Sequence, residues 1–274
     1  PLVLQLAIPV RFSKEAHFFN FLPDEMIKGS LQGSCEISPF LAPFLEEDEV
    51  IEGALGFDLS FSGPVYKPEI YGNFSWQHGK LDILKTGAIF SHIVAEGTAY
   101  GNSLIFKSIT CRDEKNGTLT AQGKIECKPD MHFPFVLHLD ANEMELVRRD
   151  FAQVTATGKA ELIGNFQKAH LKGAFTAKNA ELNLTNDFVQ TVPTLDFIFV
   201  NHPDSLRHAL KNNFTLSLDL DVALPNSGVI KGRGLDSTWK GDLKISGTTD
   251  QTLVHGKISV NKGTFSFANK EFNL

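Results

Sequence analysis

The sequence contains few residues of the kinds that form cross-links or metal sites. It has only three cysteines, Cys35, Cys111 and Cys127, and none of them forms a C-x-x-C pair. The odd number and the wide spacing argue against a disulfide framework and against a zinc knuckle. Free thiols are therefore expected, although a pairing of Cys111 with Cys127 stays open.

The chain also lacks a strong charge of either sign and lacks long apolar runs. Its 26 Lys and Arg are interspersed with 32 Asp and Glu, for a net charge of −6. Without a basic excess, nucleic acid is not an expected partner. No apolar run reaches the roughly 18 residues of a spanning helix, and no signal peptide is recognised. We expect a piece of a longer protein, with any membrane anchor outside it.

Catalytic motifs are missing as well. Neither H-E-x-x-H nor G-x-S-x-G occurs. His132, His138 and Asp140 share one side of an expected strand, but nothing supplies the further converging ligand that a metal requires. Asp219 and Asp221 are neighbours on one wet face, whereas a carboxylate pair for hydrolysis must face across a cleft. These groups predict solvated polar faces, with no metal, no cofactor and no enzymatic activity.

Phenylalanine is abundant, with 23 Phe against three Tyr and two Trp. Phe supplies apolar area without a hydrogen-bonding group. Residues 214–224, FTLSLDLDVAL, place an apolar side chain at every second position. Because a strand directs alternate side chains to opposite faces, this stretch predicts a strand with one apolar face. That face either packs inside the protein or stays open to a ligand.

A repeat of 27 residues recurs without gaps at 57–83, 158–184 and 241–267. Its small residues stand at the seventh, sixteenth and twenty-third places, which are Gly63, Gly164 and Gly247, then Gly72, Gly173 and Gly256, then Gly79, Ala180 and Gly263. Glycines between strands predict a unit of strand, loop, strand, tight turn and strand. About 20 such strands stacked about 4.8 Å apart would extend roughly 100 Å. An ordinary antiparallel meander is the alternative.

The rest of the chain follows the same pattern. Residues 103–109 place Leu104, Phe106 and Ser108 on one side of an expected strand, and residues 132–140 form another. Short helices are expected at 38–45 and 203–211. We expect residues 1–274 to form a single segment, with residues 1–50 less regular.

The C-terminal stretch is the most specific part of the sequence. Its marks are Gly232, Gly234, Leu235, Asp236, Trp239, Gly241, Leu243, Gly247, Gly256, Ile258, Gly263, Phe265, Phe267, Phe272 and Leu274. This pattern resembles the conserved region near the C-terminal end of the TamB family, the translocation and assembly module proteins of Gram-negative bacteria. The resemblance extends upstream to about Gly29.

The resemblance implies an all-β, elongated β-taco: stacked strands folded into an open U-shaped trough with an apolar interior. It implies a periplasmic bridge that is anchored to the inner membrane by a segment absent here. The implied activity is transport of phospholipid between the membranes. The alternative is a β-strand scaffold that assists assembly of outer-membrane proteins. An Omp85-type outer-membrane barrel is the implied partner, through regions outside this fragment.

The implied lipid groove would be lined by apolar side chains of the repeats and of residues 214–224. These are Leu59, Phe61, Phe74, Trp76, Leu81, Ile83, Phe175, Leu182, Leu184, Phe214, Leu216, Leu218, Leu220, Leu243, Ile245, Ile258, Val260, Phe265 and Phe267. Phospholipid acyl chains are the expected ligand. Unpaired terminal strands predict that the excised chain dimerises through its edges.

Overall fold

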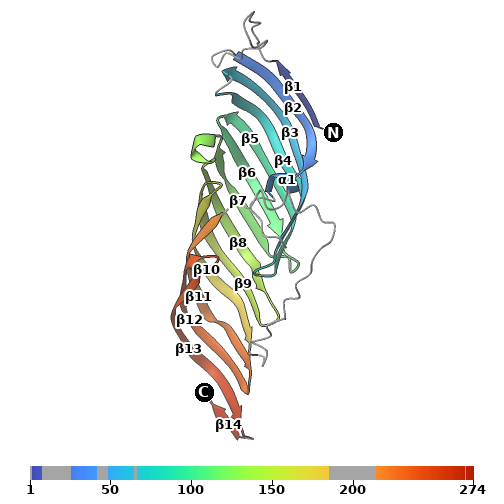
Figure 1. Cartoon of the computed structure of the whole chain (residues 1–274). Coiled ribbons are helices and arrows are strands. Elements are labelled where there is room, and N and C mark those ends of the chain that lie inside the picture. Colours follow the sequence, from blue (N-terminus) through green and yellow to red (C-terminus); the bar gives the residue numbers. More distant parts are fainter. Residues whose placement is uncertain (1, 8–25, 42–48, 65–66, 185–213, 269) are drawn as a thin grey trace, which may run out of the picture.

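One continuous sheet contains most of the residues that the structure describes. The structure is a computed structural model that describes residues 2–7, 26–41, 49–64, 67–184, 214–268 and 270–274. Its strands form a 14-stranded sheet in the order of the sequence, stacked from β1 at the top of Figure 1 to β14 at the bottom. The fold is an elongated, open, all-β trough, as predicted.

The strands are long and antiparallel, apart from the parallel pair β10–β11. Their bounds are β1 (Leu2–Ala7), β2 (Met26–Glu36), β3 (Val50–Pro64), β4 (Glu69–Ile83), β5 (Ala88–Gly101), β6 (Ser103–Arg112), β7 (Thr118–Glu126), β8 (Phe135–Arg148), β9 (Ala152–Gly164), β10 (Lys168–Asn183), β11 (Thr215–Gly232), β12 (Leu235–Thr248), β13 (Thr252–Phe267) and β14 (Lys270–Asn273).

Helical structure is confined to two short turns in the described part of the chain. Helix α1 (Ser38–Leu41) confirms the start of the first expected helix. The 3-10 helix η2 (Pro129–Met131) precedes β8. The expected strand from residue 132 begins only at Phe135, because His132 and Phe133 adopt positive φ. Residues 42–45 and the expected helix at 203–211 lie outside the described residues.

The three copies of the repeat share one strand register, because their sixteenth-place glycines pair with the equivalent residues Leu59, Ala160 and Leu243. The predicted turns, however, are partly wrong. The seventh-place glycines do lie at strand ends, as Gly63 does at the end of β3. The sixteenth-place glycines, such as Gly72, lie in the middle of strands instead. Gly79 lies at a β-bulge within β4 rather than at a turn. The predicted second and third strands are therefore one long strand, and 14 strands about 4.8 Å apart stack to roughly 60 Å.

A line of bulges divides the long strands into two halves. Register shifts occur between Trp76 and Gly79, between Ala141 and Met144, and between Leu224 and Gly228. Bulges bend a strand and increase its twist, so a line of them folds the sheet along its length. We call the edge that carries the β3–β4, β5–β6, β7–β8, β9–β10 and β12–β13 connections the first rim. The opposite edge, with the β4–β5, β6–β7, β8–β9 and β11–β12 connections, is the second rim.

The two rims approach each other across the fold. Lys85 lies in the β4–β5 turn of the second rim, and Asp250 lies in the β12–β13 turn of the first rim. Lys85 Nζ is 2.9 Å from Asp250 Oδ1 although 165 positions separate the residues. A continuous sheet brings opposite rims together only by curling, so this contact shows that the sheet forms a trough.

Candidate functional site

The most distinctive feature of the sheet is an unbroken apolar row across its strands. Residues that pair directly across neighbouring strands share one face. The first row runs from β1 to β12 through Leu2, Gly33, Phe57, Phe74, Gly97, Phe106, Gly123, Leu137, Leu162, Leu171, Leu218 and Gly247. It contains no polar side chain over these twelve strands.

A second row lies beside the first row, closer to the first rim. It passes from β1 to β11 through Leu4, Leu31, Leu59, Gly72, Ala99, Leu104, Ile125, Phe135, Gly164, Ala169 and Leu216. These residues are also all apolar or glycine. The two rows show that one face of the sheet, here called the apolar face, is continuous along the stack.

A third row lies on the other side of the first row. It crosses β2 to β13 through Cys35, Leu55, Trp76, Ala95, Ile109, Ala121, Leu139, Ala160, Gly173, Leu220, Ile245 and Val254. Ile109, rather than the predicted Ser108, joins this face. The bulge between Phe106 and Ile109 inserts the extra residue that keeps the apolar side chains together.

Glycines keep the apolar face even, because they leave room for large neighbouring side chains. The rings of Phe74 and Phe106 come from strands on either side of Gly97, and they meet edge to face with centroids 5.0 Å apart. A Cβ on Gly97 would lie 2.2 Å from Cζ of Phe74. The absent side chain therefore lets the rings close over the backbone.

The opposite face of the sheet is polar and carries ion pairs. Lys244 Nζ lies 2.8 Å from Asp219 Oδ1 and 3.7 Å from Asp221 Oδ1. The hydrogen bond from Lys244 lowers the pKa of Asp219 below its usual value. Lys159 similarly pairs with Asp140 at 3.1 Å. Both carboxylate sites therefore lie on the polar face, as predicted.

Strand pairing puts the predicted groove residues on one side of the sheet. All those that lie within strands are on the apolar face, while Leu184 and Phe214 stand just beyond the ends of β10 and β11. Their exposure differs widely: Leu59 is 8% exposed and Phe267 is 67% exposed.

Central residues of the apolar face were missing from the predicted groove set. Phe106, Ile125, Leu137 and Leu162 occupy the middle strands of the first two rows. Alternation in the sequence marks several of them as strand residues. Only the pairing of β6 to β9 shows that they join the N-terminal and C-terminal parts of the apolar face.

The second-rim half of the apolar face contains the dry core. Ile93, Cys111, Ala141 and Met144 are buried together, and Met144 is 0% exposed. Partly buried side chains pack against them, namely Trp76, Leu81, Phe90, Ile109, Leu119, Leu146 and Phe175. The apolar face is thus filled by side chains in this region.

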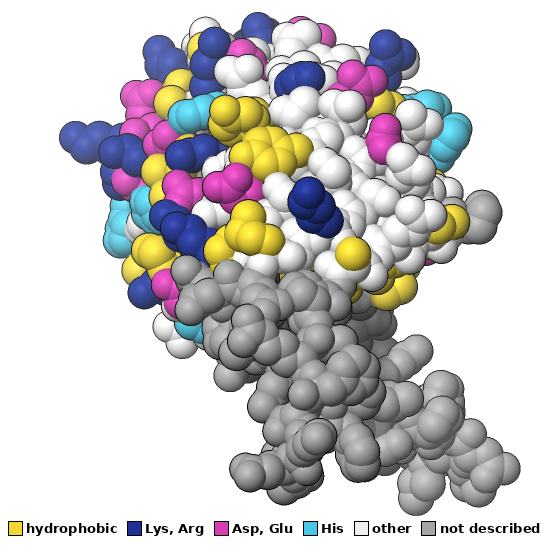
Figure 2. Space-filling view, turned by 90° about the horizontal axis from the view of Figure 1, so that it is seen from above, with side chains coloured by type: hydrophobic (Ala, Val, Ile, Leu, Met, Phe, Trp, Pro, Cys, Tyr) yellow, Lys and Arg dark blue, Asp and Glu magenta, His cyan; other side chains and the backbone are white. Residues whose placement is uncertain are grey.

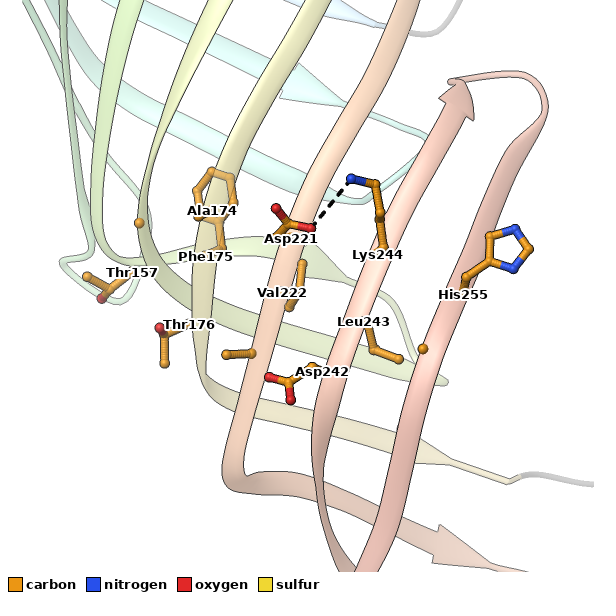
Figure 3. A pocket seen from close by; sticks show the side chains of 13 residues that line it. Thr157, Ala174, Phe175, Thr176, Asp221, Val222, Asp242, Leu243, Lys244 and His255 are labelled. Carbon is orange, nitrogen blue, oxygen red and sulfur yellow. Dashed lines mark ion pairs between the residues drawn. The ribbon is translucent and has the colours of Figure 1, made fainter.

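Two shallow hollows follow cross-strand rows on either side of the dry core. The larger, about 750 Å³, crosses β9 to β13 beside Phe175, Val222 and Leu243 (Figure 3). The smaller, about 420 Å³, crosses β2 to β6 beside Phe57 and Phe74. Residues of both faces line them, since each strand of a single layer is accessible from both sides. Figure 3 shows Lys244 reaching toward Asp221 at the larger hollow.

The three cysteines are free thiols. Cys111 lies at the second-rim end of β6, whereas Cys127 follows the first-rim end of β7. A disulfide needs Cα atoms within about 7 Å, so the length of β7 keeps this pair apart. Burial raises the pKa of the Cys111 thiol to about 11.

Other site classes find little support in the described part of the molecule. No group of three His, Cys, Asp or Glu side chains converges there as metal ligands. Among the same residues, none of the helices has the length and apolar character needed to cross a membrane.

In the view from above, charged side chains gather mainly along the left side (Figure 2).

Comparison with known proteins adds one decisive match. A family model described as the TamB C-terminal domain matches residues 107–274, more than half of the chain. The chain belongs to the TamB family. No curated protein and no solved structure matches it.

The TamB match starts within β6 and runs to the end of the chain. It therefore includes the apolar rows from β7 onward. Strands β1 to β5 precede the match, yet they continue the same rows without a polar interruption. The apolar face is thus one structural feature on both sides of the start of the match. Family membership gives the chain a TamB-type role in general terms.

Proposed function

We propose that this chain is a segment of a periplasmic bridge that carries phospholipids along its apolar face between the inner and outer membranes. The observation that carries the proposal is the first row, which stays apolar from Leu2 to Gly247. Membership of the TamB family supports a role in envelope transport or assembly.

The energetics favour an acyl chain as the ligand. Burial of each CH₂ is worth about 0.8 kcal/mol, so a 16-carbon tail in water costs roughly 12 kcal/mol. An apolar face removes much of that barrier all along the route. The two hollows formed by described residues are shallow, which favours sliding of the tail over tight capture.

Photo-crosslinking tests the proposal directly. A photo-reactive amino acid at Leu218 or Phe267 would lie on the apolar face, and one at Ser217 is the control on the opposite face of β11. The chain is expressed in the periplasm, irradiated, and analysed by lipid mass spectrometry. Phospholipid adducts at Leu218 and Phe267 but not at Ser217 are expected. Equal labelling at all three positions, or none, would refute a lipid track.

A scaffold for the assembly of outer-membrane proteins is the second candidate. One observation favours it: β14 pairs only with Thr264–Phe267 of β13, so the outer edge of β13 at 252–262 has no strand partner among the described residues. An open edge templates an incoming strand through backbone hydrogen bonds. In the same experiment, crosslinks from β13 to unfolded outer-membrane proteins, without lipid adducts, would favour this role.

A further inference from the structure

The two halves of the apolar face differ in how far solvent enters. In the second-rim half between β5 and β9, Ile93 is 5% exposed and Met144 is 0% exposed. Trp76 and Leu81, from the preceding strand, pack against this cluster. A side chain with no accessible surface leaves no room for a ligand beside it.

In the first-rim half the small side chain of Ala99 is 4% exposed, but the large side chains across the same strands stay accessible. Phe106, Ile125 and Leu137 project from β6, β7 and β8 onto the apolar face, and each is only partly buried. Leu137 and Met144 lie in the same strand and on the same face, on opposite sides of the bulge at Ala141. Among the large side chains of β8, exposure therefore falls from Leu137 in the first-rim half to Met144 in the second-rim half.

The short β6–β7 hairpin explains why the second-rim half is less accessible than the first-rim half. Because β6 ends at Arg112 and β7 starts at Thr118, β5 and β8 contact each other beyond the hairpin. The Arg148 N–H donates to the Thr86 carbonyl at 2.8 Å. Polar contacts therefore hold the second rim closed over Ile93 and Met144.

Buried carboxylates reinforce this closure. Asp113 is 6% exposed, and its Oδ2 accepts the Glu145 N–H at 2.7 Å. Glu145 is 3% exposed and pairs with Lys115, whose Nζ is 2.7 Å from Oε1. These contacts tie the β6–β7 turn to β8 and so stabilise the closed state of the second-rim half.

We propose that acyl chains cross the middle of this protein only along the first-rim half of the apolar face, following the first two rows. The second-rim half between β5 and β9 is a dry spine that holds the trough in shape. This inference rests on the proposed function and narrows its path. Trp76 and Leu81 leave the set of groove residues, while Phe106, Ile125 and Leu137 enter it.

The chemistry of the first-rim half favours an acyl chain over a polypeptide. Its rows offer no side-chain donor or acceptor from β2 to β11. A peptide lying flat there would bury N–H and C=O groups without partners, which is unfavourable. An acyl chain has no such groups to satisfy.

One diazirine label, placed in turn at two positions of β8, distinguishes the two halves of the apolar face. The chain has three methionines, so Met26→Leu and Met131→Leu leave Met144 as the sole site for photo-methionine. The matched variant adds Leu137→Met and Met144→Leu, which moves the label to the other half. Leu and Met exchange with little change in volume, so both proteins are expected to fold. Each is irradiated with vesicles of phosphatidylethanolamine and phosphatidylglycerol.

We expect phospholipid adducts at position 137 and only background labelling at Met144. Comparable adducts at both positions would overturn the inference while leaving the lipid function intact. Adducts at Leu218 but not at position 137 would also overturn it, because the track would then avoid the middle of the first row. If neither position 137 nor Leu218 yields adducts, the proposed function itself fails.

A charge placed in each half is a second test. Leu137→Arg leaves its charge on a partly exposed face, so the protein should stay folded and lose lipid adducts at Leu218. Met144→Arg buries an unpaired charge and should abolish the cooperative unfolding transition. A folded Met144→Arg protein with normal circular dichroism would show that the second-rim half is open.

Discussion

The residue scale shows how single side chains make the surface uniform. Phe74 and Phe106 close over Gly97, and the two rings cover backbone that a side chain would push apart. Ser237 is a polar residue on this face. It is 2% exposed and accepts a hydrogen bond from Nε1 of Trp239 at 2.8 Å. Its polar group is thus satisfied within the protein.

Cys111 leads to a prediction about alkaline stability. Burial raises its pKa to about 11 from an ordinary value of 9.0, so the folded chain keeps a proton that the unfolded chain releases. The contribution of this thiol is fully present below pH 9 and is lost as the pH rises toward 11. Urea unfolding between pH 8 and 11 should show a shallower loss of stability in Cys111→Ala than in the unsubstituted chain. Identical slopes would mean that the thiol is not desolvated.

The element scale explains why the bends occur where they do. The bulges at Gly79 and beyond Ala177 allow each strand to turn while its apolar side chains remain on one face. Sequence periodicity alone predicts that such a glycine ends a strand. The shorter β6–β7 hairpin then leaves backbone groups of β8 without a strand partner, and a side chain replaces that partner.

Asp113 supplies the missing partner, which gives a prediction at this scale. Its Oδ1 accepts the N–H groups of Lys115 and Gly117 at 2.8 and 2.7 Å, and its Oδ2 accepts that of Glu145. Asp113→Ala leaves these groups unpaired and should lower the free energy of unfolding by about 3 kcal/mol. Asp113→Asn keeps one acceptor oxygen and should lose less.

Urea titration measures the free energies of unfolding of the two Asp113 variants. Asp130→Ala is the control, since Asp130 is an exposed carboxylate of η2. Equal stability of Asp113→Ala and the unsubstituted chain would show that the β6–β7 turn does not depend on this carboxylate.

At the scale of the whole molecule, a long sheet exposes its last strand. Val254 is 58% exposed and Ile258 is 51% exposed on β13, where β14 does not reach. Open apolar edges recruit other strands unless charges interrupt them. The edge of β13 is therefore where self-association is expected.

Sedimentation velocity tests this expectation. The chain should associate as its concentration rises, and Val254→Lys with Ile258→Lys should shift it toward monomer. Ile105→Lys is the control, because this residue is 40% exposed but lies in the interior strand β6. A monomer at every concentration tested would contradict edge pairing.

The strand pattern, the apolar character of one face and the family resemblance could all be predicted from the amino-acid order alone. Alternation such as that of residues 214–224 is local, and so it predicts β11 without any knowledge of its neighbours. The same local reading placed Asp219 and Asp221 on the opposite face from Leu218.

How the strands join and which part of the apolar face is filled depend on contacts between residues far apart in the chain. Bulges are relations between two strands, so one strand's periodicity could not distinguish Gly79 in a bulge from a glycine in a turn. Leu137 and Met144 are both apolar residues of β8, and nothing local sets them apart. Met144 is buried because β5 and β8 meet beyond a short hairpin, a contact between residues far apart in the chain.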